Sequence, residues 1–360
     1  MIPLLPSWHL ARAIVHSHFN RTRPPYKLTF AITHRCNSRC LACDIWKKSE
    51  PPEPLSLEEI TRFFQKNPYF SWIDLTGGEP FLRPDLPALT QALLRHSSRL
   101  YHLHLPTNAV APQLVIQRVQ EILAQNPARL TITLSLDGPE TLHDTLRGVT
   151  GNWQHALEIW RHFQRHPDPR LQLFFGYTLS DLNLEALTET MRQVQTALPG
   201  LDSRVWHMNI AHHSSHYYAN SANPLRSPEN QAAFVREITA FRAIKRREPF
   251  HPIRFLELCY LDYALAFIRG KSHPMPCRAL RSSLFLAPDG TVFPCSIWDR
   301  PAGNLRAFDF DLRALLASSA AQEITGEIRA SRCPGCWTPC DAYPTILGNL
   351  PLAFAPVRPS

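Results

Sequence analysis

The 360-residue sequence has no run approaching the roughly 20 apolar residues that a membrane-spanning helix needs, so we expect no membrane span. We also expect no secretion signal, because Met1–Ile14 contains prolines and no adequate apolar core before a small-residue cleavage site. We therefore expect a cytoplasmic protein, since a reducing compartment favours cysteines that bind metals over cysteines paired in disulfides.

Basic residues are not concentrated in any one segment. The 38 Lys and Arg residues exceed the 30 Asp and Glu residues by 8, but they are scattered along the chain. We therefore expect no nucleic-acid partner. A hydrophobic content of 44% in 360 residues predicts a large α/β unit with a smaller module beside it.

Nine cysteines are present, and three of them form the first of two groups, Cys36-x3-Cys40-x2-Cys43, after a strand-like run at 27–33. Three thiolates on one loop can hold three irons of a cubane cluster and leave the fourth iron open, whereas most clusters use four thiolates. Zinc is the alternative, but structural zinc takes four ligands and no nearby histidine stands at zinc-finger spacing.

This triplet resembles the cluster motif of the radical S-adenosylmethionine (SAM) superfamily. The strand-like run at 72–75 leads into Thr76-Gly77-Gly78-Glu79-Pro80, which is similar to the GGE motif of that family. The resemblance implies that Gly77, Gly78 and Glu79 bind the amino end of SAM, with the Glu79 carboxylate accepting from the ammonium group.

Two later motifs follow in the order of the family. Pro106-Thr107-Asn108 resembles its Thr-Asn-Gly step, although Ala109 stands where relatives have glycine. The stretch 135–148 resembles the family's SLDG…HD…RG pattern, which implies positions near SAM or substrate for Asn108, Ser135, Asp137 and Arg147. Ala42 replaces the common aromatic residue before the third cysteine, and Trp46 is expected to supply that surface.

The chain from residue 27 to about 210 alternates strand-like and helical runs. The predicted strands are 27–33, 72–75, 101–105, 130–136, 171–179 and 204–210. Ser56 and Glu59 form a capping-box pattern for a helix over 56–65. Six such repeats predict parallel strands, and they fit the partial (β/α)6 barrel of the radical SAM family, with its active site at the carboxyl ends of the strands.

Composition also gives expectations for two segments next to the predicted barrel. The stretch 206–213 holds three histidines, His207, His212 and His213, which are either metal ligands or part of a polar, solvated loop that continues to residue 220; we expect the loop. The apolar positions of the first 15 residues predict a helix that caps the barrel rather than one that docks on a membrane.

The second cysteine group combines a predicted hairpin with a compact motif. Asp289-Gly290 between apolar runs predicts a turn that brings Cys295 back toward Cys277. Further along comes Cys333-x2-Cys336-x3-Cys340. Four thiolates can hold zinc or an iron–sulfur cluster.

This second group resembles the SPASM and twitch extensions of radical SAM enzymes, which implies an auxiliary [4Fe-4S] cluster. A full SPASM module needs about seven cysteines, and none follows Cys340, so we expect one such cluster. Five cysteines compete for its four positions: Cys277, Cys295, Cys333 and Cys336 fit best, with Cys340 an alternative to one of the last pair. Cys259 is expected to be a buried structural thiol.

The resulting division has five parts. We expect an N-terminal extension (1–25), a radical SAM partial barrel (26–225), a helical connector (226–270), a SPASM/twitch-like domain (271–345) and a C-terminal tail (346–360).

The resemblance implies that the Cys36/Cys40/Cys43 cluster passes an electron from a partner such as flavodoxin or ferredoxin to SAM. The 5′-deoxyadenosyl radical so formed takes hydrogen from a substrate. A small molecule that is oxidised or modified is the first hypothesis. A peptide is the second, disfavoured because about 26 residues before the first strand are too few for a leader-binding domain. A non-catalytic electron carrier is the third, and the SAM motifs argue against it.

Overall fold

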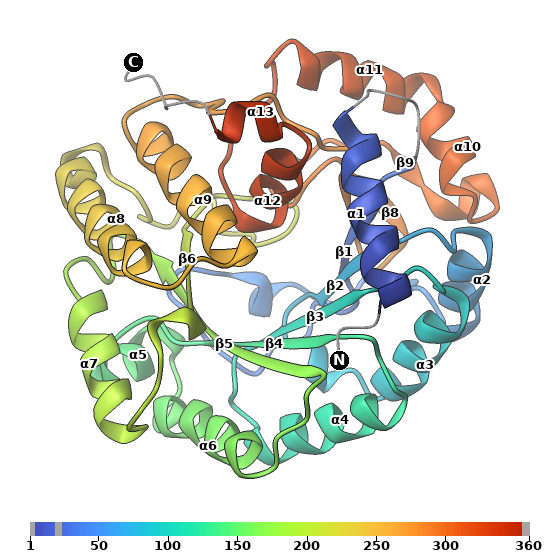
Figure 1. The fold of residues 1–360 in the computed structure, drawn as a ribbon. Helices are drawn as coiled ribbons and strands as arrows, with labels where there is room; N and C mark the ends of the chain where they lie inside the picture. Colours follow the sequence, from blue (N-terminus) through green and yellow to red (C-terminus); the bar gives the residue numbers. More distant parts are fainter. Residues whose placement is uncertain (1–3, 19–23, 355–360) are drawn as a thin grey trace.

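The computed structural model describes residues 4–18 and 24–354, and in them nine strands form one sheet. The strands are β1 (Lys27–Ala31), β2 (Trp72–Thr76), β3 (His102–Thr107), β4 (Leu130–Ser135), β5 (Leu171–Leu179), β6 (Trp206–Ile210), β7 (Ser283–Leu286), β8 (Thr291–Phe293) and β9 (Gly303–Asn304). Their order is β6-β5-β4-β3-β2-β1-β7-β8-β9 (Figure 1). Strands β1 to β7 are parallel to their neighbours, whereas β8 and β9 are antiparallel.

Helices follow the strands and surround the curved sheet (Figure 1). They are α1 (Leu4–His18), α2 (Leu57–Lys66), α3 (Leu86–His96), α4 (Pro112–Ala124), α5 (Glu140–Arg147), α6 (Asn152–Arg165), α7 (Leu187–Ala197), α8 (Gln231–Arg246), α9 (Pro252–Ile268), α10 (Leu312–Ala317), α11 (Ser319–Arg329), α12 (Pro339–Leu347) and α13 (Leu350–Ala353). The six predicted β/α repeats and the α/β class are confirmed. None of the described helices is long and apolar enough to cross a membrane.

Local signals placed several of these elements correctly. The capping box of α2 is confirmed, since Ser56 Oγ accepts from Glu59 N at 3.2 Å and Glu59 Oε2 accepts from Ser56 N at 2.9 Å. The predicted hairpin is β7–β8, with Phe285 opposite Phe293. The sixth strand begins two residues later than predicted, because Ser203–Val205 forms a 3₁₀ turn capped by the Asp202 side chain.

Alternation along the strands separates an apolar outer face from a polar inner face. In β6, Trp206, Met208 and Ile210 are buried, whereas His207 and Asn209 between them are half-buried. Strand β3 repeats the pattern, with His102 and His104 half-buried and leucines between them fully buried. The helices therefore seal the outer face, and the inner face of the barrel stays polar and partly accessible.

The C-terminal module is attached to the barrel through the sheet itself. Strand β7 pairs in parallel with β1 over four residues, from Lys27 opposite Ser283 to Phe30 opposite Leu286. The second cysteine group therefore begins beside the strand that leads into the first one. At the other end of the chain, Arg278 Nη1 donates to the Ser17 carbonyl of α1 at 3.3 Å. The predicted capping role of α1 stays a prediction.

Candidate functional site

The loop with the first three cysteines leaves β1 and rests on the C-terminal end of α5. Arg39 N donates to the Arg147 carbonyl and Leu41 N to the Leu146 carbonyl, both at 2.9 Å. The carbonyls at the end of a helix have no partner within the helix, so they are free to hold a passing loop. Gly148, at φ +62°, permits the approach, because a Cβ there would lie 2.8 Å from the Arg39 oxygen. The loop and the end of α5 are therefore one packed unit.

Glu50 holds the start of the same loop, and sequence reasoning missed it. One carboxylate oxygen, Oε1, accepts from His34 N and from Arg35 N at 2.9 Å each, and also from the Thr33 hydroxyl. The loop entrance is thereby fixed by a residue that follows the third cysteine by seven positions. A lone glutamate before a Pro-Pro pair carries no sequence signal of this role.

Polar donors surround the sulfur atoms of this loop. Asn108 Nδ2 lies 3.6 Å from Cys36 Sγ, and Arg147 Nη1 lies 3.7 Å from Cys40 Sγ. Burial raises the pKa of Cys36 to about 11 and that of Cys43 to about 12. The thiols are therefore protonated until a metal displaces the protons, and the donors then stabilise the thiolates. This donor set fits a group bound through three cysteine sulfurs.

The Gly77-Gly78 pair packs on the cysteine loop without room for a side chain. Gly77 has φ +139°, and a Cβ there would lie 2.1 Å from the Thr33 oxygen; at Gly78 it would lie 2.2 Å from the Arg35 oxygen. Backbone hydrogen bonds from Gly78 N to Thr33 O (3.0 Å) and from Glu79 N to Arg35 O (2.8 Å) join the two loops. Only glycine allows this contact.

The Glu79 side chain is buried, with 3% of its surface exposed, and ties the β2 loop to the end of β3. Its Oε2 accepts from Asn108 N at 2.7 Å, and its Oε1 from Phe81 N at 3.3 Å. Burial, opposed by these hydrogen bonds, raises the pKa of Glu79 to about 7. Both oxygens thus serve backbone amides, and the contact with a SAM ammonium group stays a prediction.

A buried histidine links the loops after β3 and β4. His143 Nδ1 accepts from Asp137 N at 3.1 Å, so its Nε2 carries the proton and donates to Asn152 Oδ1 at 3.0 Å. Asn152 Nδ2 then donates to the Asn108 carbonyl at 2.8 Å. Burial, with the nearby Arg147 charge, lowers the pKa of His143 to about 3. His143 of the motif therefore joins the loops after β3 and β4 through buried hydrogen bonds.

Because the pKa of His143 is lowered in the folded protein, we expect the free energy of unfolding to fall in acid. The unfolded state takes up a proton near pH 6.5, whereas folded His143 does so only near pH 3. The free energy of unfolding should therefore fall as pH drops from about 6.5 to 3, by at most about 1.4 kcal/mol per pH unit for this group. Urea unfolding at pH 7, 6 and 5 should show a shallower pH dependence in His143→Gln than in wild type. The control His96→Gln should keep the wild-type slope, and a wild-type slope in His143→Gln would contradict the assignment.

The remaining predicted residues lie at the same edge of the sheet. Asp137 and Arg147 form an ion pair at 2.6 Å, and Asp137 Oδ1 accepts from Thr178 N at 2.8 Å. Ser135 ends β4 on the half-buried face, opposite Gly176 of β5. The structure thus brings all the predicted residues of the barrel together at the carboxyl ends of β1 to β4.

The segment after β6 is mostly buried, so the expectation of a solvated loop was wrong. His212 is 6% exposed and Ser214 and Asn220 are each 2% exposed, although His213 is exposed. His212 Nδ1 donates to the Ile210 carbonyl at 2.6 Å, and its Nε2 accepts from Trp337 N at 3.0 Å. Both nitrogens are thereby engaged with the backbone. Packing against the C-terminal segment, which local composition does not record, buries His212.

Residues 211–223, which we call the bridging loop, contact both cysteine groups. On one side, Asn220 Nδ2 donates to the Ala42 carbonyl and Asp44 N to the Tyr218 carbonyl, both at 2.9 Å. On the other side, Ser214 Oγ donates to the carbonyl of Ser296, the residue after Cys295, at 2.8 Å. The bridging loop therefore fixes the two groups relative to each other.

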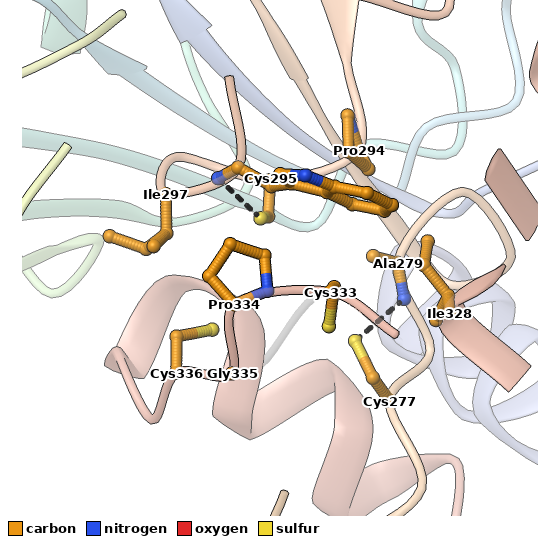
Figure 2. Close-up of a pocket in the computed structure, with 11 residues that line it drawn as sticks. Cys277, Ala279, Pro294, Cys295, Ile297, Ile328, Cys333, Pro334, Gly335 and Cys336 are labelled. Atoms are coloured by element: carbon orange, nitrogen blue, oxygen red, sulfur yellow. Dashed lines mark hydrogen bonds between the residues drawn. The ribbon is translucent and has the colours of Figure 1, made fainter. Parts of the chain in front are cut away.

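Four cysteines of the second group line one pocket. They are Cys277, Cys295, Cys333 and Cys336, and they come from three separate segments of the chain (Figure 2). Nitrogen donors approach three of the sulfurs: Ala279 N lies 3.4 Å from Cys277, Trp298 N 3.3 Å from Cys295 and His273 Nε2 3.2 Å from Cys333. Four thiols with such donors fit a group bound through thiolates.

Cys340 is absent from the lining of this pocket. It lies at the start of α12, where its carbonyl accepts from Lys27 Nζ, and burial raises its pKa to about 12. Cys259 is buried and its thiol lies 3.5 Å from the Ala353 carbonyl. All nine cysteines are free thiols, and no three described His, Cys, Asp or Glu side chains are placed to share a single metal ion.

Two family models match this chain. Residues 30–194 match the radical SAM superfamily, and residues 277–341 match SPASM, an iron–sulfur cluster-binding domain. Among curated proteins, the sporulation killing factor maturation protein SkfB of Bacillus subtilis is 23% identical over 176 residues, which are 48% of this chain and 40% of SkfB. A GTP 3′,8-cyclase of Acidothermus cellulolyticus is 34% identical over 130 residues, 33% of this chain and 34% of the cyclase. The matches thus span about a third to two fifths of these relatives.

Solved structures share the fold over most of the chain. The enzyme anSMEcpe with bound AdoMet superposes with a TM-score of 0.60 at 12% identity, covering 91% of this chain and 98% of that one. Streptococcus suis SuiB bound to S-adenosylmethionine superposes with a TM-score of 0.58 at 18% identity, covering 88% and 71%. At these identities the likeness establishes the arrangement of the barrel and the C-terminal module.

Proposed function

We propose that this chain, which belongs to the radical SAM superfamily and carries a SPASM domain, reductively cleaves SAM and abstracts a hydrogen atom from a substrate. The observation that carries the proposal is the three-cysteine loop packed against Gly77-Gly78 at the open end of the barrel. The cluster and SAM, when bound, supply one-electron cleavage to methionine and a 5′-deoxyadenosyl radical, with the electron delivered by a carrier such as flavodoxin or ferredoxin.

The chain's own residues hold and orient the bound groups. Cys36, Cys40 and Cys43 bind three irons of a [4Fe-4S] cluster, and the Asn108 amide and Arg147 guanidinium donate to their sulfurs. Gly77 and Gly78 let the loop after β2 pack directly on the cysteine loop, so that SAM would meet the backbones of both loops side by side. Ser135 at the end of β4 and the Asp137–Arg147 ion pair would lie near the SAM ribose and carboxylate or near the substrate.

The second pocket binds an auxiliary [4Fe-4S] cluster through Cys277, Cys295, Cys333 and Cys336. Its lining and the SPASM match support this assignment over the set that includes Cys340. When bound there, the cluster would supply a one-electron acceptor for the substrate radical or an anchor for the substrate, which fits net oxidation or radical crosslinking. Metal analysis decides between this cluster and zinc.

A peptide is the second candidate substrate beside a small molecule. SuiB has been solved bound to its precursor peptide SuiA, and anSMEcpe with the Cp18Cys peptide. The GTP 3′,8-cyclases among the relatives support a small molecule instead. A short precursor-peptide gene beside this one, whose product changes mass in the reaction, would decide for the peptide.

Reduced, reconstituted protein should form 5′-deoxyadenosine from SAM slowly even without substrate, since the open iron and the SAM pocket are both in this chain. Liquid chromatography of anaerobic reactions measures the product. Protein that holds both clusters and yet forms none would support the non-catalytic electron carrier.

Replacing Glu79 by alanine should weaken SAM binding roughly tenfold or more and leave the iron content unchanged. The lost contact is the one with the ammonium group of SAM, a charge-assisted hydrogen bond worth about 1.5–3 kcal/mol, and the buried amides Asn108 N and Phe81 N also lose the acceptor that positions the loop. Anaerobic spectral titration with SAM gives the affinity.

The variant Glu79→Gln separates the two roles of this residue. If the carboxylate positions the backbone, the amide oxygen of glutamine should preserve most of the affinity. If it binds the ammonium group of SAM by charge, glutamine should lose as much as alanine. Wild-type affinity in Glu79→Ala would remove Glu79 from the site.

A further inference from the structure

The pocket of the second cysteine group lies at the protein surface. Pro334, between Cys333 and Cys336, is exposed, and Ile297 and Trp298 on the opposite side are half-buried. All three apolar side chains line the pocket, and Figure 2 shows Pro334 and Ile297 beside the cysteines. A group bound in this pocket would therefore lie close to solvent, with Pro334 on its exposed side.

Four basic residues lie within two positions of residues that line this pocket or pack on it, and we call them the basic rim: Lys271, Arg281, Arg329 and Arg332. Lys271 precedes Ser272, whose carbonyl would lie 2.5 Å from a Cβ on Gly335, so its segment packs on the cysteine turn. Arg332 and Arg329 directly adjoin Cys333 and the pocket residue Ile328. Lys271, Arg329 and Arg332 are exposed and Arg281 is half-buried.

Arg281 completes the rim beside Arg329. It follows the pocket residue Ala279 by two positions, and burial, then the charges of Arg278 and Arg329, lower the pKa of Arg281 to about 10. Like charges gathered in this way repel one another, and they stay together only because the fold fixes their backbones. The rim is therefore a place where binding of negative charge relieves repulsion.

The positive charge of the rim is not neutralised within the described chain. None of the four residues forms an ion pair there, and the acids of α11 are engaged elsewhere, since Glu323 and Glu327 both pair with Arg300. Of the other acids near the pocket, Asp299 accepts a hydrogen bond from Ser215, and the buried Asp341 accepts from Thr338 at 3.3 Å and from Ser296 at 3.4 Å. The rim therefore offers unpaired positive charge to a partner of opposite charge.

We propose that the basic rim docks an acidic one-electron carrier protein over the C-terminal pocket. Protein–protein interfaces commonly have an apolar centre and a polar or charged rim. Opposite charges on the two partners raise the association rate. This inference rests on the proposed function, because the pocket must hold a cluster. No bond forms or breaks: the reduced cluster loses the electron taken from the substrate radical, and the oxidised carrier gains it.

The test is a charge reversal at two exposed positions, Lys271→Glu/Arg332→Glu, in the reconstituted enzyme. Stopped-flow mixing of dithionite-reduced enzyme, freed of excess reductant, with an oxidised acidic flavodoxin gives the second-order rate of electron exchange. The wild-type rate should fall at least tenfold between about 10 and 300 mM salt. The double variant should be at least tenfold slower at low salt and nearly independent of salt.

The matched control is Arg95→Glu/Arg99→Glu, which reverses two exposed arginines on and after α3, away from α11 (Figure 1). It should stay within twofold of wild type. An uncharged quinone should oxidise all three proteins at one rate, and dithionite-driven SAM cleavage should be equal in all three, which shows intact folding.

Three outcomes would overturn the inference. The rim variant could exchange electrons with flavodoxin at the wild-type rate. Enzyme lacking the second cluster through Cys277→Ala/Cys295→Ala could do the same, which would place the docking site elsewhere. Loss of binding to single-stranded RNA in the rim variant, with electron exchange unchanged, would assign the rim to nucleic acid. Wild-type enzyme that holds no second cluster would instead refute the proposed function.

Discussion

The triple variant Cys36→Ala/Cys40→Ala/Cys43→Ala is expected to lose about half of the protein's iron and all of its SAM cleavage. Wild-type protein with two cubane clusters should carry about eight irons and eight sulfides per chain after anaerobic reconstitution. The three cysteines lie on one loop whose sulfurs receive the Asn108 and Arg147 donors, so removing them removes one whole cluster. Iron and sulfide assays with chromatography of 5′-deoxyadenosine measure both losses.

Cys259→Ala is the matched control for this variant. Its buried thiol approaches the Ala353 carbonyl and takes no part in either cysteine group. It should keep all eight irons and wild-type SAM cleavage. A triple variant that retained the full iron content would show that the N-terminal loop does not bind a cluster.

The double variant Cys277→Ala/Cys295→Ala is expected to abolish turnover of the true substrate and to spare much of the uncoupled SAM cleavage. In the proposed function SAM meets only the barrel cluster, whereas the second cysteine pocket is joined to that loop only through the bridging loop. Iron content should fall by about half, and formation of 5′-deoxyadenosine should continue at a comparable rate. Complete loss of SAM cleavage in a folded double variant would contradict this division of roles.

Comparing Cys340→Ala with Cys336→Ala tests which cysteines bind the second cluster. The structure places Cys340 outside the pocket, so the variant should keep both clusters, whereas Cys336→Ala should lose the second one. Loss of the second cluster in Cys340→Ala would restore the alternative ligand set. One cluster with one zinc in wild-type protein would refute the auxiliary cluster altogether.

The physical reasons for correct and missed predictions are visible in particular residues. The capping box at Ser56 and the Asp289-Gly290 hairpin depend on neighbours within a few positions, so the sequence alone reveals them. The bridging loop was misread because its polar residues satisfy one another and distant backbone groups, as His212 does with Trp337. The local composition of a loop does not indicate hydrogen-bond partners that are distant in sequence.

Some roles within the motifs also needed the structure. Sequence placed Glu79 near a bound ammonium group, and the fold shows its carboxylate engaged with the amides of Asn108 and Phe81. His143 and Asn152 hold two motif loops together through a buried chain of hydrogen bonds. Motif spacing indicates that these residues matter at the site, but only their contacts say what each one does.

The sequence by itself determined the superfamily, the alternation of strands and helices, and the two cysteine groups. Periodicity, turn chemistry and motif spacing are local properties that a linear chain displays. Only the tertiary structure decided which four C-terminal cysteines share a pocket, and that four scattered basic residues gather around it. The reason is that β7 joins the sheet beside β1, more than 250 positions away, and this pairing brings together residues whose proximity no local pattern records.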